Sequence, residues 1–181
     1  MNARIDPSLI AAPELYFATL PSGLRVPYVA HGAGEPLVFV HGSLCDYRYW
    51  NGQVDALSKD FLCVSVSLSH YWPAQDTFPD TEFSWRAHVD ELAGFLAAMN
   101  LGPVHLAGHS RGGCIAFHLA REYPELVKTL VLADPGGPLQ IDGTPPADLP
   151  EATKAVRRNV AALIQRGETE AGVEVVGEAG G

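Results

Sequence analysis

The chain has 181 residues, a net charge of −9, 47% hydrophobic residues and 18% charged residues. This length and composition predict a globular protein with a substantial core and exclude an intrinsically disordered chain. The acidic balance argues against nucleic acid or an anionic membrane as a partner, because either would require a basic face. No window approaches the roughly 18 uninterrupted apolar residues of a spanning helix, so no membrane partner is expected.

The three cysteines lie in separate apolar segments: Cys45, Cys63 and Cys114. Their odd number and their spacing predict reduced thiols, and residues 1–7 lack the apolar core of a secretory signal. We therefore expect a cytoplasmic protein. No cluster of Cys and His has ligand spacing and no glycine loop is suited to phosphate, so neither a metal nor a cofactor is expected.

The sequence of the first third of the chain predicts several strands and one helix. Residues 16–20 and 24–30 flank Pro21-Ser22-Gly23 and predict an N-terminal hairpin. The apolar run at 36–40 predicts a strand buried on both faces of a parallel sheet, and therefore a central one. Asp46 could cap a helix over 47–57, and a further strand is expected at 61–66.

The next segments alternate between helix and strand. Residues 69–82, rich in proline, aromatic and acidic residues, predict a surface loop before a helix that Ser84 caps and that Gly102-Pro103 ends. Further elements are expected at 103–107 (strand), 110–122 (helix) and 127–133 (strand). This alternation predicts an α/β protein with a doubly wound, mostly parallel sheet between two helical layers.

The composition changes after Pro135, where proline and glycine become frequent. This stretch predicts a linker that leaves the sheet, followed by an amphipathic helix over 150–165. We therefore divide the chain into residues 1–135, which form the sheet, and residues 136–181, which form the linker and a helical segment.

One hexapeptide carries the chemistry: Gly108-His109-Ser110-Arg111-Gly112-Gly113 follows an apolar strand and opens a helix. This strand, G-x-S-x-G and helix order is typical of a nucleophile elbow, in which a serine occupies a strained turn. Gly108 and Gly112 would let the helix start approach the strand closely. The alternative is a chance match to a short motif, which the surrounding strand and helix disfavour.

A second turn could complete the site. His41-Gly42-Ser43 ends the strand at 36–40, so the backbone N–H of Ser43 could point at the same place as that of Arg111. Two such amides would form an oxyanion hole, and they need no particular side chain. For His41 itself we expect a structural role in orienting the turn.

These features resemble the α/β-hydrolase superfamily over nearly all of residues 16–166. The resemblance implies a serine hydrolase acting on an ester or other acyl substrate, and makes 136–181 the start of a helical cap over a pocket for a small hydrophobic substrate. A serine at the elbow differs from the aspartate of haloalkane dehalogenases and epoxide hydrolases. Non-hydrolytic family chemistry, such as that of perhydrolases or acyltransferases, stays open.

In the family, the serine works with an acid and a histidine, which complete a catalytic triad. This chain matches those two positions less well. Asp134, at the end of the strand at 127–133, stands where some members carry the acid, but an aspartate before Pro135 is equally a turn signal. All seven histidines precede Asp134, whereas the family carries its histidine after the last strand. Only His70, in a loop after a strand, could face the site from an unusual direction.

The resemblance also implies a fold truncated after the strand at 127–133 and the start of the cap. That strand would then be a sheet edge, open to a complementing chain or to a second copy of the protein. A non-catalytic fragment, or half of a two-chain assembly, is therefore the alternative to an active hydrolase.

Overall fold

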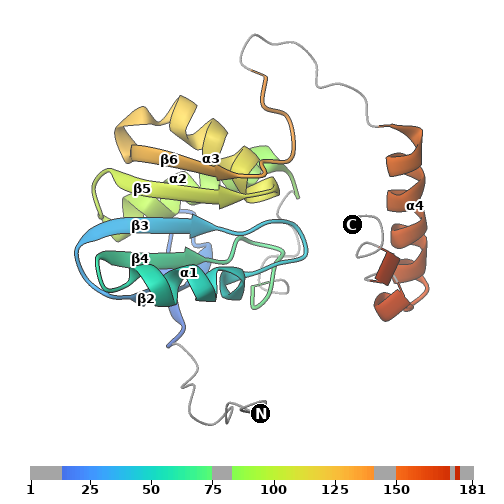
Figure 1. The fold of residues 1–181 in the computed structure, drawn as a ribbon, viewed down its shortest axis with the longest axis horizontal. Coiled ribbons are helices and arrows are strands. Elements are labelled where there is room, and N and C mark those ends of the chain that lie inside the picture. The colour runs from blue at the N-terminus through green and yellow to red at the C-terminus, as the bar shows by residue number, and fades with distance from the viewer. Residues whose placement is uncertain (1–13, 75–82, 141–149, 172–173, 176–181) are drawn as a thin grey trace, which may run out of the picture. The chain divides into compact units, whose positions relative to one another are not determined.

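The computed structural model describes residues 14–74, 83–140, 150–171 and 174–175 (Figure 1). The chain divides into two compact units, Met1–Leu139 and Gln140–Gly181. The first unit contains a six-stranded sheet in the order β1-β2-β4-β3-β5-β6. Its strands are β1 (Tyr16–Thr19), β2 (Arg25–His31), β3 (Glu35–Val40), β4 (Phe61–Val66), β5 (Val104–His109) and β6 (Val127–Ala133).

The sheet is antiparallel at one edge and parallel elsewhere. β1 pairs with β2 around a turn in which the Gly23 N–H donates to the Leu20 carbonyl at 2.9 Å, so the predicted hairpin is confirmed. β2 then pairs with β4 in antiparallel fashion, and β4, β3, β5 and β6 follow in parallel. The mostly parallel α/β sheet predicted from the sequence is therefore confirmed.

Alternate residues of the central strands serve two cores, one on each face of the sheet. On β3, Val38 and Val40 enter one core, whereas Leu37 and Phe39 enter the other. The continuous apolar run reflects burial on both faces, as expected for a strand covered by helices on either side.

Helices cover both faces of the sheet. A 3-10 helix (Tyr47–Trp50) and α1 (Asn51–Leu57) lie on one face, whereas α2 (Trp85–Met99) and α3 (Arg111–Glu122) lie on the other (Figure 1). The single helix predicted over 47–57 is wrong in its first turn. The Asp46 carboxylate caps the 3-10 helix by accepting the Arg48 N–H at 2.9 Å, and the α-helix begins only after Trp50.

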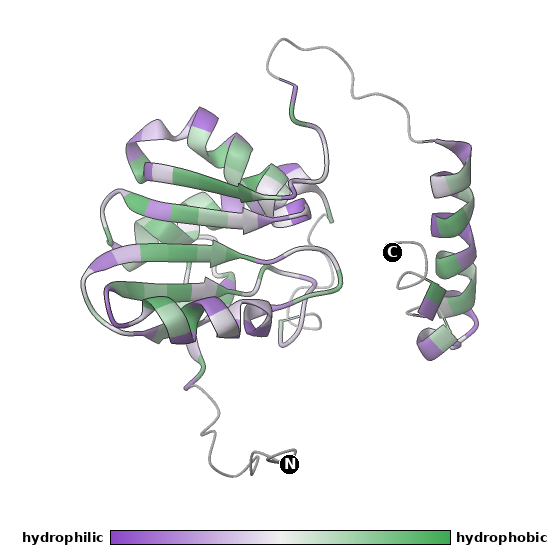
Figure 2. Cartoon of the chain, viewed as in Figure 1, coloured by the Kyte–Doolittle hydropathy of each residue, from purple (hydrophilic) through white to green (hydrophobic). Residues whose placement is uncertain are grey.

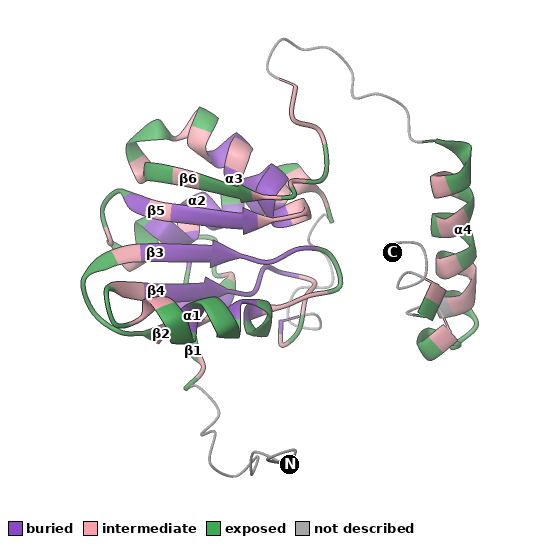
Figure 3. Cartoon of the chain, in the orientation of Figure 1, coloured by how far each residue is buried: buried purple, intermediate pink, exposed green. Residues whose placement is uncertain are grey.

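The β6 edge differs from the sheet centre. Figure 3 shows β3, β4 and β5 largely buried and β6 largely exposed, although β6 is itself rich in hydrophobic residues (Figure 2). On β6, Val131 is 57% exposed and Leu132 is 36% exposed. Among the described residues, β6 is the edge strand on this side of the sheet.

The second unit contains α4 (Glu151–Gln165), the helix predicted over 150–165. The predicted boundary at residues 135 and 136 stays a prediction. The backbone at Pro138 is still tied to α3, because its carbonyl accepts from His118 Nε2 at 2.6 Å. No helix in the described parts of the chain combines the length and apolar character needed to cross a membrane.

Candidate active site

Ser110 occupies a strained turn between β5 and α3. Its φ of 49° and ψ of −120° place a residue with a side chain in a region that costs of order 1–3 kcal/mol. Hydrogen bonds on both sides hold this conformation: the Ser110 N–H donates to the Ala133 carbonyl at 3.1 Å, and the Gly136 N–H donates to the Ser110 carbonyl at 2.9 Å. The turn therefore has the geometry expected of a nucleophile elbow.

Two elbow glycines allow backbone segments to come unusually close. A methyl group added at Gly108 would lie 2.4 Å from the Gly112 carbonyl oxygen, and one added at Gly112 would lie 2.4 Å from the His41 carbonyl oxygen. Neither position has room for a side chain. The start of α3 is thereby held directly against the ends of β5 and β3.

The turn at 41–43 lies beside the elbow, as the oxyanion-hole prediction requires. A methyl group added at Gly42 would lie 2.8 Å from His109 Nδ1 and 3.1 Å from Ser110 Cβ. Within the described residues, no acceptor is found for the backbone N–H of Ser43 or of Arg111. Arg111 is the first residue of α3, where such amides lack partners within the helix. Their role as donors to an incoming oxyanion stays a prediction.

His41 is buried and links this turn to the end of β4. Its Nε2 accepts the Leu68 N–H at 3.2 Å, so Nδ1 carries the proton, and Nδ1 lies 2.8 Å from the Gly42 carbonyl oxygen. Burial lowers the pKa of His41, which keeps the ring neutral. These contacts support the orienting role predicted for this residue.

Asp134 follows β6 directly and is exposed, with a φ of 46°. The turn that it begins packs on the elbow, because a methyl group added at Gly136 would lie 3.4 Å from Ser110 Oγ. Asp134 thus belongs to a segment adjacent to the nucleophile, and its role as the acid stays a prediction.

Four histidines make contacts that do not involve Ser110. His105 contacts Glu35 at 2.8 Å and Thr129 at 2.7 Å, His118 contacts the Pro138 carbonyl, and His109 stacks on Tyr49 with ring centroids 4.5 Å apart. His70 lies in an aromatic group, with its ring centroid 5.4 Å from that of Phe83 and 5.8 Å from that of His88. None of these contacts is a hydrogen bond to Ser110.

Sequence reasoning missed a cluster around the Arg111 side chain. Arg111 Nη2 lies 3.2 Å from His88 Nδ1, and its guanidinium carbon lies 4.6 Å from the centroid of the Phe83 ring. The Tyr71 ring lies beside these residues, with its centroid 6.1 Å from that of Phe83 and 6.0 Å from that of His88, and burial raises the pKa of Tyr71. The available signal was position, since Tyr71 follows the carboxyl end of β4, where sites gather in such sheets.

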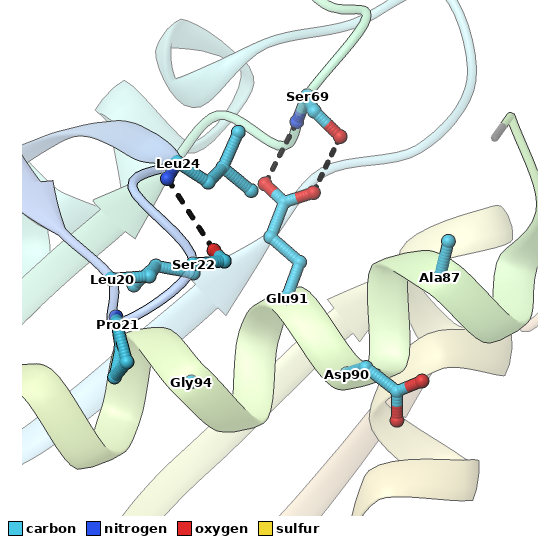
Figure 4. Close-up of a pocket in the computed structure, with 9 residues that line it drawn as sticks. All are labelled: Leu20, Pro21, Ser22, Leu24, Ser69, Ala87, Asp90, Glu91 and Gly94. Carbon is cyan, nitrogen blue, oxygen red and sulfur yellow. Dashed lines mark hydrogen bonds between the residues drawn. The ribbon is translucent and has the colours of Figure 1, made fainter. Parts of the chain in front are cut away.

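A buried carboxylate fixes the segment that leads to Tyr71. Glu91 of α2 accepts hydrogen bonds from the Ser69 N–H at 2.8 Å and from the Ser69 hydroxyl at 2.5 Å (Figure 4). Burial raises the pKa of Glu91. The two residues also line a pocket of about 480 Å³ between the β1–β2 turn and α2. Neither Ser110 nor Ser43 lines this pocket, so it is separate from the elbow.

Metal chemistry has no obvious ligand set here. Among the residues that the structure describes, no group of three His, Cys, Asp or Glu side chains could hold a metal ion.

Comparison with known proteins gives a family match. The family model described as the alpha/beta hydrolase fold matches residues 35–166, which include both turns and the elbow. An uncharacterised protein of Mycobacterium tuberculosis is 29% identical over 128 residues, covering 71% of this chain and 37% of that protein.

Two further similar proteins have named activities. The (E)-2-((N-methylformamido)methylene)succinate hydrolase of Acinetobacter baylyi is 32% identical over 105 residues, covering 58% of this chain and 39% of that protein. The solved structure of a thermophilic esterase from Thermogutta terrifontis is 27% identical with a TM-score of 0.66, covering 83% of this chain and 53% of that one. The chain thus spans under two fifths of the length of these curated relatives.

Proposed function

Because this chain belongs to the α/β-hydrolase fold family, we propose that it is a hydrolase that uses Ser110 as the nucleophile on a small ester or other acyl substrate. The observation that carries the proposal is the strained conformation of Ser110 at the start of α3, beside the turn at 41–43. Two free backbone amides next to that serine support the same chemistry.

The proposed reaction has two stages. Ser110 Oγ attacks the acyl carbon and passes its proton to a base, while the Ser43 and Arg111 N–H groups donate to the oxygen that becomes negative. The carbon–oxygen bond to the leaving group then breaks, and the leaving alcohol takes up the proton. Water hydrolyses the acyl-serine, which releases the acid and restores Ser110. Removing one such donor typically costs about 3–4 kcal/mol of transition-state stabilisation.

We propose that Asp134 is the acid, since it begins the turn that packs on the elbow. The names of the relatives support acyl chemistry, because one is a hydrolase of a succinate derivative and another is an esterase. A largely apolar pocket for a small substrate is proposed by analogy with the family.

A fluorophosphonate probe tests the proposal, because it reacts with a serine that is both activated and flanked by oxyanion donors. We expect one adduct per chain, located on Ser110 by peptide mapping and lost in Ser110→Ala. The matched control is Ser22→Ala, which changes an exposed serine on the β1–β2 turn and should label normally. No adduct on the wild-type chain would overturn the proposal.

We also propose a cytoplasmic site of action, which the reduced state of the cysteines supports. Cys45, Cys63 and Cys114 are all free thiols. Small-molecule substrate binding, without nucleic acid or membrane, fits the acidic composition.

A second candidate function is that of one half of an assembly, with a second chain covering β6. The exposed apolar residues Val131 and Leu132 on an edge strand favour it, because such an edge is a template for pairing. Size-exclusion chromatography over a wide concentration range tests this candidate. We expect a concentration-dependent larger species that Val131→Lys suppresses, whereas a monomer at every concentration would contradict self-association.

A further inference from the structure

Arg111 directly follows the proposed nucleophile in the chain, and its side chain is surrounded by rings instead of acids. His88 accepts a hydrogen bond from Nη2 at 3.2 Å, and the Phe83 ring stacks on the guanidinium at 4.6 Å. The Tyr71 ring belongs to the same group, with its centroid 6.1 Å from that of Phe83 and 6.0 Å from that of His88. We call Tyr71, Phe83 and His88 the arginine cage.

The arginine cage carries no charge at neutral pH. His88 Nε2 lies 3.1 Å from the Ser69 carbonyl oxygen, an acceptor, so Nε2 carries the proton and Nδ1 accepts from Arg111. Burial, assisted by the charge of Arg111, lowers the pKa of His88 to about 4. Burial raises the pKa of Tyr71, which keeps the phenol neutral. The rings thus hold the guanidinium in place without neutralising it.

No carboxylate within the described residues forms an ion pair with Arg111. Glu91, a buried acid on α2, has both carboxylate oxygens bonded to Ser69. Arg111 Nε is buried and lacks a hydrogen-bond partner in the described part of the chain. Other arginines are paired with acids: Arg48 with Asp46, Arg86 with Asp90 and Glu122, Arg158 with Glu151, and Arg166 with Glu168.

We propose that Arg111 and the arginine cage form a subsite for a carboxylate group of the acyl substrate. A planar guanidinium binds a carboxylate through two parallel hydrogen bonds, and a site enclosed by rings strengthens such a pair. The inference rests on the proposed function of Ser110, because that serine fixes where the acyl carbon would sit.

The position of Arg111 narrows the substrate class. Its backbone N–H is a proposed oxyanion donor, while its side chain would bind the carboxylate. One residue would then contact both the reacting carbonyl and an anionic group a few bonds away. The substrates that fit are half-esters or half-amides of short dicarboxylic acids, which are small and otherwise apolar.

Isothermal titration calorimetry with succinate tests the subsite without requiring catalysis. We expect saturable binding to the wild-type chain and a Kd roughly 10- to 100-fold higher in Arg111→Gln, as for loss of a charged hydrogen-bonding partner. Arg111→Lys should give an intermediate Kd, since lysine keeps the charge but lacks the two parallel N–H donors of the guanidinium. The matched control is Arg86→Gln on α2, which should bind as the wild type does.

Thermal unfolding of each variant checks that a weaker Kd does not reflect an unfolded chain. The inference is overturned if succinate does not bind the wild-type chain, or if folded Arg111→Gln binds it equally well. Butyramide, a neutral compound of similar size, should not compete with succinate, and effective competition would also overturn the inference.

Labelling of Ser110 by fluorophosphonate separates the two proposals. Labelling without succinate binding would overturn the subsite and leave the hydrolase proposal in place. Succinate binding through Arg111 without labelling would overturn the hydrolase proposal and support the anion site. If both hold, succinate should slow labelling of the wild-type chain and leave labelling of Arg111→Gln unchanged.

Discussion

The centre of the sheet and its β6 edge are built from similar apolar residues but are buried to very different extents. Leu106 on β5 is fully buried, whereas Val131 on the neighbouring β6 is 57% exposed. The proposed site lies at the carboxyl ends of the central strands, where glycines allow backbone segments to touch. The proposed nucleophile and oxyanion donors therefore come from the buried centre, whereas the proposed acid follows the exposed strand.

One side-chain truncation in each region tests whether the buried region contributes more to the free energy of unfolding than the β6 edge does. Leu106→Ala should lower the free energy of unfolding by about 2–5 kcal/mol, because it leaves a cavity in the core. Val131→Ala removes apolar surface that is already exposed, and should cost below about 1 kcal/mol. Urea unfolding measures both. Similar losses would mean that β6 is covered in solution.

The second comparison uses two glycines at the second position of a helix. Gly112 in α3 has the backbone of β3 in contact, whereas Gly52 in α1 has open space around it. Gly112→Ala should destabilise the fold by about 1–3 kcal/mol through overpacking. Gly52→Ala should stabilise it by about 0.4–1 kcal/mol, since alanine restricts the unfolded chain. Equal effects would contradict the close approach at the elbow.

A pH series isolates the contribution of His88 to the cluster near the elbow. Its folded pKa of about 4 lies below its usual value of 6.5, so between these pH values the unfolded chain binds a proton that the folded chain does not. The stability that wild-type His88 provides relative to His88→Gln is therefore complete above pH 6.5. It should fall by about 3 kcal/mol as the pH drops to 4. A difference independent of pH would show that His88 is not held neutral.

Much of the fold was predictable from local patterns. The run at 36–40 indicated a doubly buried strand, and the sequence around Ser110 indicated an elbow at the strand end. The ends of the helices and strands were harder to predict, because they depend on strand pairing. β5 extends to His109, since Gly108 and His109 pair with Leu132 and Ala133 of β6. The break after Trp50 depends likewise on tertiary packing, since Trp50 is buried against Phe39.

The site was predictable only in its main-chain parts. Ser43, Ser110 and Arg111 follow motif positions, whereas the contacts among Tyr71, His88 and the Arg111 side chain join three segments far apart in sequence. No local periodicity records such contacts. The sequence did not identify the base either, and in the structure His41, His105 and His118 bond to groups other than Ser110.

The central claim is that the sheet centre places Ser110 between two oxyanion donors, ready for acylation. Peptide mapping after exposure to p-nitrophenyl butyrate tests it most directly, because an acyl-serine accumulates when its hydrolysis is slow. The account predicts a butyryl group on Ser110 that forms faster than on Ser43 or Ser69, and that is absent in Ser110→Ala. Butyrylation spread over exposed serines and lysines, with Ser110 unmodified, would contradict it.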